Sequence, residues 1–427
     1  MVLRDSSLNF ESVKDVLDYG LCTGCGTCVG ICPHGVLEMS QSSDTAVPTL
    51  SSSSLCVGCR LCLRVCPGIS LNFKSLNEAV FGKQPIDLQL GNHVACYLGW
   101  TLDPEIRRVS SSGGLVTSLL AFLLESEEIS GALVTRMNRA RPFQADAFLA
   151  RTREEVLEAA GSKYLQVATN VAIKDIRRQE GKFVVVGLPC HIHGFRNAER
   201  FDARLKAKIV AHFGLFCGHT VNSAGLYYLL EKLNVEKHDV VRIRYRTKGW
   251  PGGLLVDLKD GSRIFYPHSS YWNNLFGLLM FTPRRCLFCA DGTNEFADLS
   301  FGDAWLPELK SERGASVVVS RSVVGERLLS LTRALGAVEL VRIKSAKVIQ
   351  SQKGMLRFKK RKLRARLMIA RMIRIEPPRI VAQLPNPEPI DYLSGFFPFL
   401  VAASSSSERL RRYSRTLGYI TRLFNAF

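Results

Sequence analysis

Two cysteine runs with the same spacing constrain the fold of this chain more than any other feature. Each reads Cys-x2-Cys-x2-Cys-x3-Cys-Pro, over residues 22–33 and again over residues 56–67. This spacing places three thiolates around one four-iron cubane, and the fourth cysteine binds the neighbouring cluster. The sequence therefore predicts a ferredoxin-like unit with two 4Fe–4S clusters. One predicted ligand set is Cys22, Cys25, Cys28 and Cys66, and the other is Cys56, Cys59, Cys62 and Cys32.

Zinc sites and disulfide frameworks are the other uses of closely spaced cysteines. A zinc site takes four ligands, usually as two Cys-x2-Cys pairs, and gives no reason for a third cysteine and a Cys-Pro step in both halves. Disulfides belong to oxidising compartments, whereas we find no N-terminal signal peptide and expect a reducing cytoplasm. No apolar run reaches the roughly 18 residues that a membrane-spanning helix needs.

The chain divides by composition into four parts. Residues 1–85 contain the cysteine runs, whose two halves are separated by a Ser-rich stretch, Ser40 to Ser54, that we expect to be an exposed loop. Residues 90–170 and 171–345 alternate short apolar runs with helical patterns. This alternation predicts an α/β, or mixed α+β, body with some parallel sheet. The predicted strands are residues 131–134, 183–186, 208–211 and 316–319, and the predicted helices are residues 115–124 and 225–233.

The fourth part, residues 346–427, is strongly basic. The chain carries 57 Lys and Arg against 38 Asp and Glu, and thirteen of these cations fall between Val341 and Arg374, where there is no acidic residue. Met355 to Arg374 fits an amphipathic helix with Leu356, Leu363, Leu367 and Ala370 on one face. Three interpretations stay open: peripheral contact with an anionic membrane, docking of an acidic redox partner, or a helix packed on its own domain with a solvated charged side. No nucleic-acid motif accompanies the charge.

Five cysteines lie outside the ferredoxin-type runs. Cys190 and Cys217 each follow a predicted strand, and Cys286 and Cys289 form a Cys-x2-Cys pair. The carboxyl ends of neighbouring strands line the ligand crevice of an α/β sheet, so these four thiols are candidates for a third 4Fe–4S cluster. The alternative is a reactive thiol at Cys190, with the others in the core. We expect Cys96 to be an ordinary buried cysteine.

Three loops offer small or cationic residues to a cofactor. Ser110 to Gly114 precedes an apolar helix and suits a phosphate, although Ser/Gly helix caps are common. Gly161 to Tyr164 and Arg246 to Gly253 add lysines and aromatic rings, but either loop can equally be a solvated surface loop. The need for a flavin is chemical, because one-electron clusters cannot transfer a hydride on their own.

Taken together, these segments resemble one known family. Ser-Ser-Gly-Gly, Gly-Ser-Lys-Tyr, Gly-Leu-Pro-Cys-His, Phe-Cys-Gly, Lys-Gly-x-Pro-Gly, Cys-x2-Cys-x-Asp and Ser-x-Gly-Asp-Ala-Trp follow the ferredoxin motifs in this order. The order is similar to that of the coenzyme F420 hydrogenase/dehydrogenase beta-subunit family, over roughly residues 20–340, with a fused two-cluster domain. Members differ in substrate, so the resemblance does not identify the reaction partner.

The resemblance implies a non-covalently bound FAD and a third cluster at Cys190, Cys217, Cys286 and Cys289. It further implies that Ser111, Ser112, Gly113 and Gly114 hold the FAD pyrophosphate, with Lys163 and Tyr164 near the flavin. Lys248 would lie beside the ring or the incoming substrate. No catalytic residue is assigned. The candidates are Lys248, His191 and Asp303, with His193 as a further proton carrier.

The function expected from these features is that of an iron–sulfur flavoprotein oxidoreductase. It would pass electrons between a two-electron partner at FAD, such as coenzyme F420, and a one-electron carrier such as ferredoxin. The alternatives are a non-catalytic electron-transfer subunit of a larger redox complex, a ferredoxin-dependent reductase of another organic substrate, as in surface-polysaccharide metabolism, and a structural cluster protein. The predicted location is cytoplasmic or peripheral on the inner face of the membrane.

Overall fold

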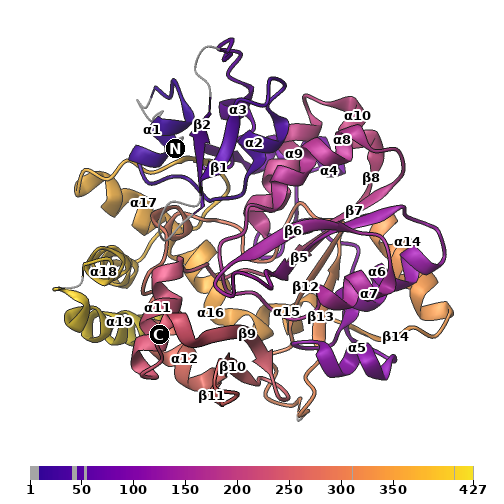
Figure 1. The fold of residues 1–427 in the computed structure, drawn as a ribbon. Helices are drawn as coiled ribbons and strands as arrows, with labels where there is room; N and C mark the ends of the chain where they lie inside the picture. Colours follow the sequence, from indigo (N-terminus) through magenta and orange to yellow (C-terminus); the bar gives the residue numbers. More distant parts are fainter. Residues whose placement is uncertain (1–8, 41–45, 52–54, 310, 408, 427) are drawn as a thin grey trace.

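An eight-stranded mixed sheet forms the centre of the protein (Figure 1). The computed structural model describes residues 9–40, 46–51, 55–309, 311–407 and 409–426. The strand order is β14-β4-β13-β12-β8-β7-β5-β6, so both halves of the 90–345 region contribute to one sheet. The strands are β4 (Ala95–Thr101), β5 (Gly131–Met137), β6 (Ala145–Ala150), β7 (Phe183–Gly187), β8 (Ile209–Leu215), β12 (Leu299–Asp303), β13 (Ser316–Ser320) and β14 (Val338–Ile343).

The middle of this sheet is parallel and its edges are antiparallel. β5, β7, β8 and β12 run parallel to one another, whereas β6, β13, β4 and β14 each pair with a neighbour in the antiparallel sense. All four strands predicted from apolar runs are present. The prediction of a mixed α/β body with some parallel sheet is therefore confirmed.

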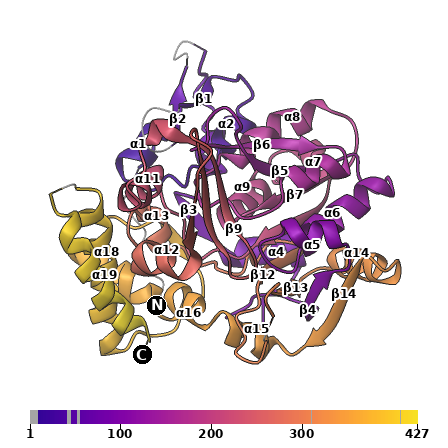
Figure 2. The same ribbon diagram turned by 60° about the horizontal axis from the view of Figure 1, so that its bottom comes forward.

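Helices cover both faces of the sheet because its strands alternate their apolar side chains between the two sides. On one face, Val134, Phe213 and Val318 pack with α6, α7 and α14. On the other face, Leu133 and Val185 pack with α8, α9 and α10. Figure 2 shows α5, α6 and α14 gathered on one side. The helices are α5 (Pro104–Val109), α6 (Leu115–Glu125), α7 (Arg153–Glu158), η1 (Thr169–Ala172), α8 (Ile173–Arg178), α9 (Pro189–Glu199), α10 (Ala203–Lys208) and α14 (Val323–Ala334).

The ferredoxin-like unit packs against the α8–α9 face and shares its core. Ile31 and Val65 are buried in the same cluster as Ile173 and Phe195. A Cβ on Gly30 would lie 2.1 Å from the Asn170 carbonyl oxygen, so α2 and η1 are in close backbone contact. The unit consists of α1 (Val13–Asp18), α2 (Thr27–Ile31), β1 (Leu37–Ser40), β2 (Val47–Leu50), α3 (Leu61–Arg64), β3 (Ser70–Asn72) and α4 (Phe73–Phe81).

The Ser-rich stretch is not simply a loop. Val47–Leu50 forms β2, which pairs antiparallel with β1. The expectation of an exposed loop from Ser40 to Ser54 is wrong for this part, because β-branched Val47 and Thr49 suit a paired strand. Residues 41–45 and 52–54 lie outside the described residues.

The C-terminal part is built into the body instead of forming a separate tail. α17 (Leu363–Met372) buries Leu363, Leu367 and Ala370 in the core shared with the ferredoxin-like unit, which confirms the predicted apolar face. β15 (Arg379–Val381) pairs parallel with β3. The predicted single helix is interrupted by a π-helical turn, η4 (Arg357–Arg361), between α16 (Lys353–Leu356) and α17. The other C-terminal helices are α15 (Ser345–Ser351), α18 (Pro389–Ser405) and α19 (Arg411–Ala426).

The expectation that the charged side of this segment is solvated is wrong for four of its cations. The exposed fractions of Lys359, Lys360, Lys362 and Arg366 are 1%, 9%, 3% and 0%. The π-helical turn carries Lys359 and Lys360 into the body, where Lys360 pairs with Glu295 and Lys359 donates to the Asp291 carbonyl. Arg366 lies on α17 and donates to the Leu287 carbonyl. Other cations of the segment, such as Arg371 and Arg374, are exposed.

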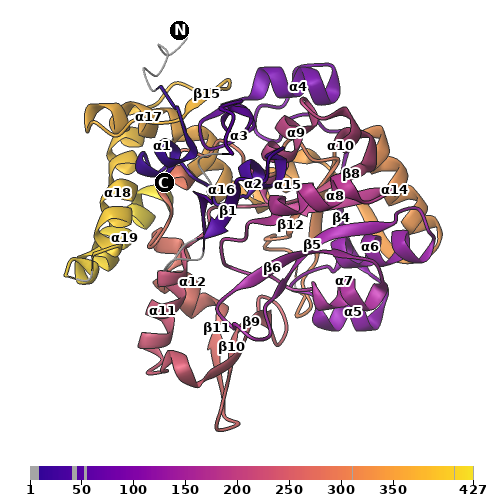
Figure 3. The same ribbon diagram turned by 45° about the horizontal axis from the view of Figure 1, so that its top comes forward.

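A small three-stranded sheet projects from the body (Figure 3). It packs with α11 and α12 around Leu226, Ile243 and Phe276. Over the described ranges, no helix combines the length and apolar character required to cross a membrane. The elements here are α11 (Ser223–Lys232), η2 (Lys237–Asp239), β9 (Val240–Thr247), β10 (Gly253–Leu258), β11 (Arg263–Pro267), α12 (His268–Asn274), η3 (Phe276–Leu278) and α13 (Arg284–Leu287).

Candidate functional site

The eight cysteines of the ferredoxin-type runs form two groups in space. Burial, with smaller contributions from the thiols of Cys66 and Cys25, raises the pKa of Cys22 to about 12. Burial also raises the pKa of Cys62, and here the contributing thiols belong to Cys59, Cys32 and Cys56. The structure thus brings together the same two sets of four that crossover ligation requires.

The third set of cysteines also converges. Cys190 lies in the first turn of α9 after β7, Cys217 follows β8, and Cys286 and Cys289 lie in and just after α13. Burial raises the pKa of Cys190 well above its usual value, and the thiols of Cys217, Cys286 and Cys289 add to this rise. These four partly buried thiols disfavour each other's ionisation, so they could all act as thiolate ligands only beside a compensating cation such as the iron of a cluster.

No group of three or more His, Cys, Asp or Glu side chains in the described part of the chain converges on one metal ion. In a four-iron cluster each thiolate binds its own iron, so four thiols surround a volume and do not meet at one point. Cys96 stands apart from these sets, buried on β4 as predicted.

The three thiol sets are neighbours in a series, which is called the row below. The Cys25 thiol contributes to the raised pKa of Cys190, so the first ferredoxin-type set lies beside the third set. The Cys62 thiol contributes to the raised pKa of Cys28, which places the second set next in line. Cys56 and Cys59 of this last set are exposed. The row therefore runs from the body of the protein to its surface.

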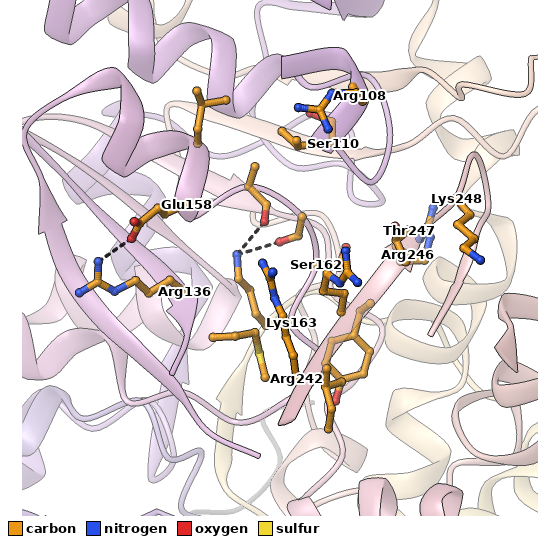
Figure 4. Close-up of a pocket in the computed structure, with 18 of the residues that line it drawn as sticks. Arg108, Ser110, Arg136, Glu158, Ser162, Lys163, Arg242, Arg246, Thr247 and Lys248 are labelled. Atoms are coloured by element: carbon orange, nitrogen blue, oxygen red, sulfur yellow. Dashed lines mark hydrogen bonds and ion pairs between the residues drawn. The ribbon is translucent and has the colours of Figure 1, made fainter. Parts of the chain in front are cut away.

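A cavity of about 960 Å³ opens on the body between β9, the β5–β6 hairpin and the segments around Ser110 and Ser162 (Figure 4). Ten of its lining residues are Lys or Arg, whereas Glu158 is the one acidic residue among the described residues of the lining. Glu158 is already paired with Arg136 at 2.8 Å and Arg139 at 2.6 Å. Cations that line a cleft in such excess focus a positive potential, so the cavity suits a polyanionic ligand.

Lys163 reaches into this cavity and is bonded to backbone carbonyls. Its amino group donates to the carbonyl oxygens of Ala159, Ala160 (3.2 Å) and Gly161 (2.9 Å). Figure 4 shows this amino group directed at backbone carbonyls. Burial lowers the pKa of Lys163 to about 7. An anion bound nearby would restore its charge.

Arg246 connects the three loops that the sequence offers to a cofactor, which contain Ser111, Tyr164 and Arg246 itself. Its guanidinium lies 2.8 Å from Asp303 Oδ2, donates to the Tyr164 hydroxyl at 3.2 Å and donates to the Ser111 carbonyl at 3.1 Å. Its Nε donates to the Pro251 carbonyl at 2.6 Å. The exposed fraction of Arg246 is 4%. Burial works against its charge, but Tyr164 and Asp303 outweigh burial and raise the pKa of Arg246. Arg246 therefore carries a permanent charge at the inner wall of the cavity.

The Ser-Ser-Gly-Gly segment, residues 111–114, follows the cavity-lining Ser110 but does not itself line the cavity, and most of its polar groups are bonded to protein. Ser112 Oγ donates to the Ala315 carbonyl at 2.7 Å, and Gly113 N donates to Ser316 Oγ at 3.1 Å. Ser111 Oγ accepts from Ser162 N at 2.8 Å. Gly114 has φ +77° and caps the start of α6. Ser110 lines the cavity itself.

Aromatic side chains with unpartnered polar atoms surround Tyr164. Its ring lies 5.5 Å from Tyr245 and 4.9 Å from Phe276, and Phe276 lies 5.8 Å from His219. The buried atoms Tyr245 Oη, Tyr271 Oη, His219 Nε2 and His268 Nε2 have no hydrogen-bond partner among the described residues. Orphaned buried polar atoms are rare in proteins. A planar ligand with several nitrogens and oxygens, such as a flavin ring, would satisfy them.

The candidate proton carriers differ in their surroundings. His191 Nδ1 accepts from Leu188 N at 3.2 Å and its Nε2 donates to the Val167 carbonyl at 3.0 Å, so both ring nitrogens are used within the protein. Burial lowers the pKa of His191 to about 4. His193 is buried against Asp291 at 2.8 Å. Lys248 is exposed at the cavity rim, with its amino group 5.1 Å from the Phe265 ring centroid. Of the candidates, Lys248 is the one placed to meet a ligand from solvent.

Several residues of this region escaped the sequence analysis. In the sequence Arg246 is only part of a cationic loop, and its left-handed backbone (φ +50°) is visible in the structure alone. Tyr245, Tyr271, His219 and His268 lie in three separate segments and carry no local motif. Lys359 is one of several cations of a basic run in the sequence. No sequence spacing could place these side chains beside each other, because tertiary contacts bring them together.

Comparisons with known proteins agree with the arrangement of the chain. Models of the coenzyme F420 hydrogenase/dehydrogenase beta subunit match residues 96–174 (N-terminal part) and residues 180–346 (C-terminal part). A model of a 4Fe–4S dicluster domain matches residues 21–68. Together the first two models cover more than half of the 427 residues.

Several relatives carry coenzyme F420 in their names. A coenzyme F420-dependent sulfite reductase of Methanocaldococcus jannaschii is 26% identical over 82% of this chain, but the match spans only 51% of that protein. The beta subunit of a coenzyme F420 hydrogenase of Methanosarcina barkeri is 27% identical over 61% of this chain and 86% of its own length. The corresponding beta subunit of Methanothermobacter thermautotrophicus is 27% identical over 60% of this chain and 88% of its own length.

One solved structure is similar in fold. It is a chain of the F420-reducing NiFe hydrogenase complex from Methanosarcina barkeri, with a TM-score of 0.54 and 23% identity. The similarity covers 69% of this chain and 98% of that chain. At this identity, the comparison shows a common fold.

Proposed function

Because this chain belongs to the coenzyme F420 hydrogenase/dehydrogenase beta-subunit family, we propose that it is an FAD-dependent iron–sulfur oxidoreductase. It exchanges a hydride with a two-electron partner, coenzyme F420 or a similar carrier, and single electrons with a carrier such as ferredoxin. The observation that most supports this proposal is the row of three thiol sets. The row begins near the aromatic cluster around Tyr164 and Phe276 and ends at the exposed Cys56 and Cys59. A bound FAD supplies the conversion between hydride and single-electron transfer.

The residues around the basic cavity fit an FAD molecule. The cations near Ser110, Ser111 and Gly161–Lys163 would hold the pyrophosphate, with Ser112, Gly113 and Gly114 shaping the segment that carries it. Tyr164 and the unpartnered atoms of Tyr245, Tyr271 and His268 would bind the ring system. Arg246 positions Tyr164 and Ser111 relative to each other. Lys248 would meet the incoming substrate at the rim.

The proposed electron route follows the thiol sets. His219, two residues after Cys217, contacts the Phe276 ring of the aromatic cluster, so the Cys190 set would receive electrons first. The sets of Cys22 and then Cys32 would continue the route outward. Cys190, Cys217, Cys286 and Cys289 would hold the third cluster, and the eight cysteines of the ferredoxin-like unit would hold the other two. The direction of electron flow depends on the partners.

A second candidate is an electron-transfer subunit in a larger redox complex. It is favoured by the relatives named as hydrogenase subunits and by the solved chain from a hydrogenase complex. The match to the sulfite reductase covers about half of that protein, so its named activity is not transferred to this chain.

Anaerobic purification tests the main proposal. We expect released FAD close to one per chain and about twelve iron atoms per chain from three four-iron clusters. We also expect oxidation of reduced coenzyme F420 with viologen as the electron acceptor. Absence of FAD after anaerobic purification and reconstitution would reject the enzyme. FAD and iron without turnover of coenzyme F420 would favour another two-electron partner or the subunit role.

A further inference from the structure

Lys359 is a buried cation that comes from outside the part of the chain matched by the family models, which end at residue 346. Its exposed fraction is 1%, although it lies in a run of six residues that contains five cations. The π-helical turn Arg357–Arg361 carries it inward, and π-turns within helices are frequent at functional sites. A lysine buried this deeply requires partners that favour its charge.

The hydrogen-bond partner of Lys359 lies beside the third thiol set, two residues after Cys289. Lys359 Nζ donates to the Asp291 carbonyl at 3.1 Å, and Cys289 Sγ donates to the same carbonyl at 3.3 Å. The amino group and the thiol therefore share one oxygen atom.

A second buried cation supports the same loop. Arg366 is fully buried, and its Nε donates to the Leu287 carbonyl at 2.8 Å, between the two cysteines of the Cys286–Cys289 pair. Its guanidinium also donates to the Phe358 carbonyl, at 2.6 Å, which fixes the π-helical turn next to Lys359. The C-terminal segment thus both shapes the loop that carries two thiols and brings a charge to it.

We infer that Lys359 is a fixed positive charge of the third cluster site, and that it raises the reduction potential of the cluster held by Cys190, Cys217, Cys286 and Cys289. Reduction adds one electron to a site that already carries four thiolates. A cation in a buried site beside the cluster ligands stabilises the reduced form more than the oxidised form. Arg366 positions the loop, and Lys359 supplies the charge. This inference rests on the proposed third cluster.

The test is a redox titration of the anaerobically purified full chain, followed by electron paramagnetic resonance. The signal of the third cluster is the one missing from a Cys286→Ser/Cys289→Ser variant. In Lys359→Gln, which keeps a donor for the Asp291 carbonyl but loses the charge, we expect the reduction equilibrium constant to fall about tenfold. For one electron this corresponds to about 59 mV toward more negative potential. Lys359→Arg should stay close to the wild type.

Lys353→Gln is the matched control, because Lys353 is an exposed cation of the same segment. It should leave all three potentials unchanged. An unchanged third potential in Lys359→Gln at full iron content would overturn the inference, as would an equal shift in Lys353→Gln. If wild-type iron is about eight per chain with FAD present, there is no third cluster and the inference fails while the flavin enzyme stands. If FAD is absent but the shift occurs, the flavin proposal fails and the role of Lys359 stands.

Discussion

Arg246 and Asp303 form an ion pair, with Arg246 Nη1 2.8 Å from Asp303 Oδ2 and only 3% of the Arg246 side chain exposed. The two residues lie at the ends of different strands, β9 and β12, in different sheets. The pair therefore fixes the small three-stranded sheet against the central sheet at the inner wall of the basic cavity. The same guanidinium holds Tyr164 and Ser111.

Replacing Arg246 with Met tests this pair. The variant leaves the Asp303 carboxylate without its buried partner, and loss of one member of a buried pair costs about 3 kcal/mol or more. We expect the free energy of unfolding in urea to fall by that amount, with weaker retention of FAD. Arg327→Met is the control, since Arg327 forms an exposed pair with Glu128 at 3.7 Å. It should change stability by about 1 kcal/mol or less. Equal effects in the two variants would contradict the assigned role.

The third thiol set is tested by iron content. Cys286→Ser/Cys289→Ser removes two of four proposed ligands, so iron should drop from about twelve to about eight per chain, with both ferredoxin-type signals retained. Cys96→Ala is the matched control because Cys96 is buried away from the three sets. Loss of all iron in the double variant would mean that the loop serves the ferredoxin-like unit instead.

Arg285 links the ferredoxin-like unit to the body. It donates to the Pro67 carbonyl at 2.8 Å and the Gly68 carbonyl at 3.0 Å, both buried. Arg285→Met leaves these carbonyls unsatisfied, and we expect a loss of about 3 kcal/mol in the free energy of unfolding because such bonds involve a charged donor. Arg284→Met, at the exposed neighbouring position, should change it little. Limited proteolysis should then release the ferredoxin-like unit from Arg285→Met first, and equal resistance would argue against the link.

The lowered pKa of Lys163 predicts a specific pH dependence of the free energy of unfolding in the FAD-free protein. Burial lowers the pKa of Lys163 from the ordinary 10.5 to about 7 in the folded protein. At a pH between these two pKa values, the unfolded chain therefore binds more protons than the folded chain. Stability from this group therefore rises as pH increases through that window. Lys163→Met lacks this contribution. Urea unfolding at about pH 7.5 and about pH 10 should show the stability of the wild type rising relative to the variant toward the higher pH. A pH-independent difference would place the Lys163 pKa outside the window.

The cysteine motifs alone determined the ferredoxin-like unit, because cubane ligation fixes ligand spacing locally along the chain. Apolar runs such as Phe183–Val186 likewise determined the strands of the central sheet, since a buried strand needs a continuous apolar segment. The family resemblance also came from the sequence, through ordered short motifs. These features are local, and local physical requirements leave a readable pattern.

Only the tertiary structure decided where the charges and rings meet. The sequence presents Lys359 and Arg366 as members of a basic, amphipathic run. The fold turns them inward toward the Cys286–Cys289 loop, because the core shared by α17 and the ferredoxin-like unit buries the apolar face beside them. Arg246 likewise gains its partners from Asp303, Tyr164 and Ser111, each on a different segment. Burial and partner choice depend on contacts between distant parts of the chain, and no local pattern records such contacts.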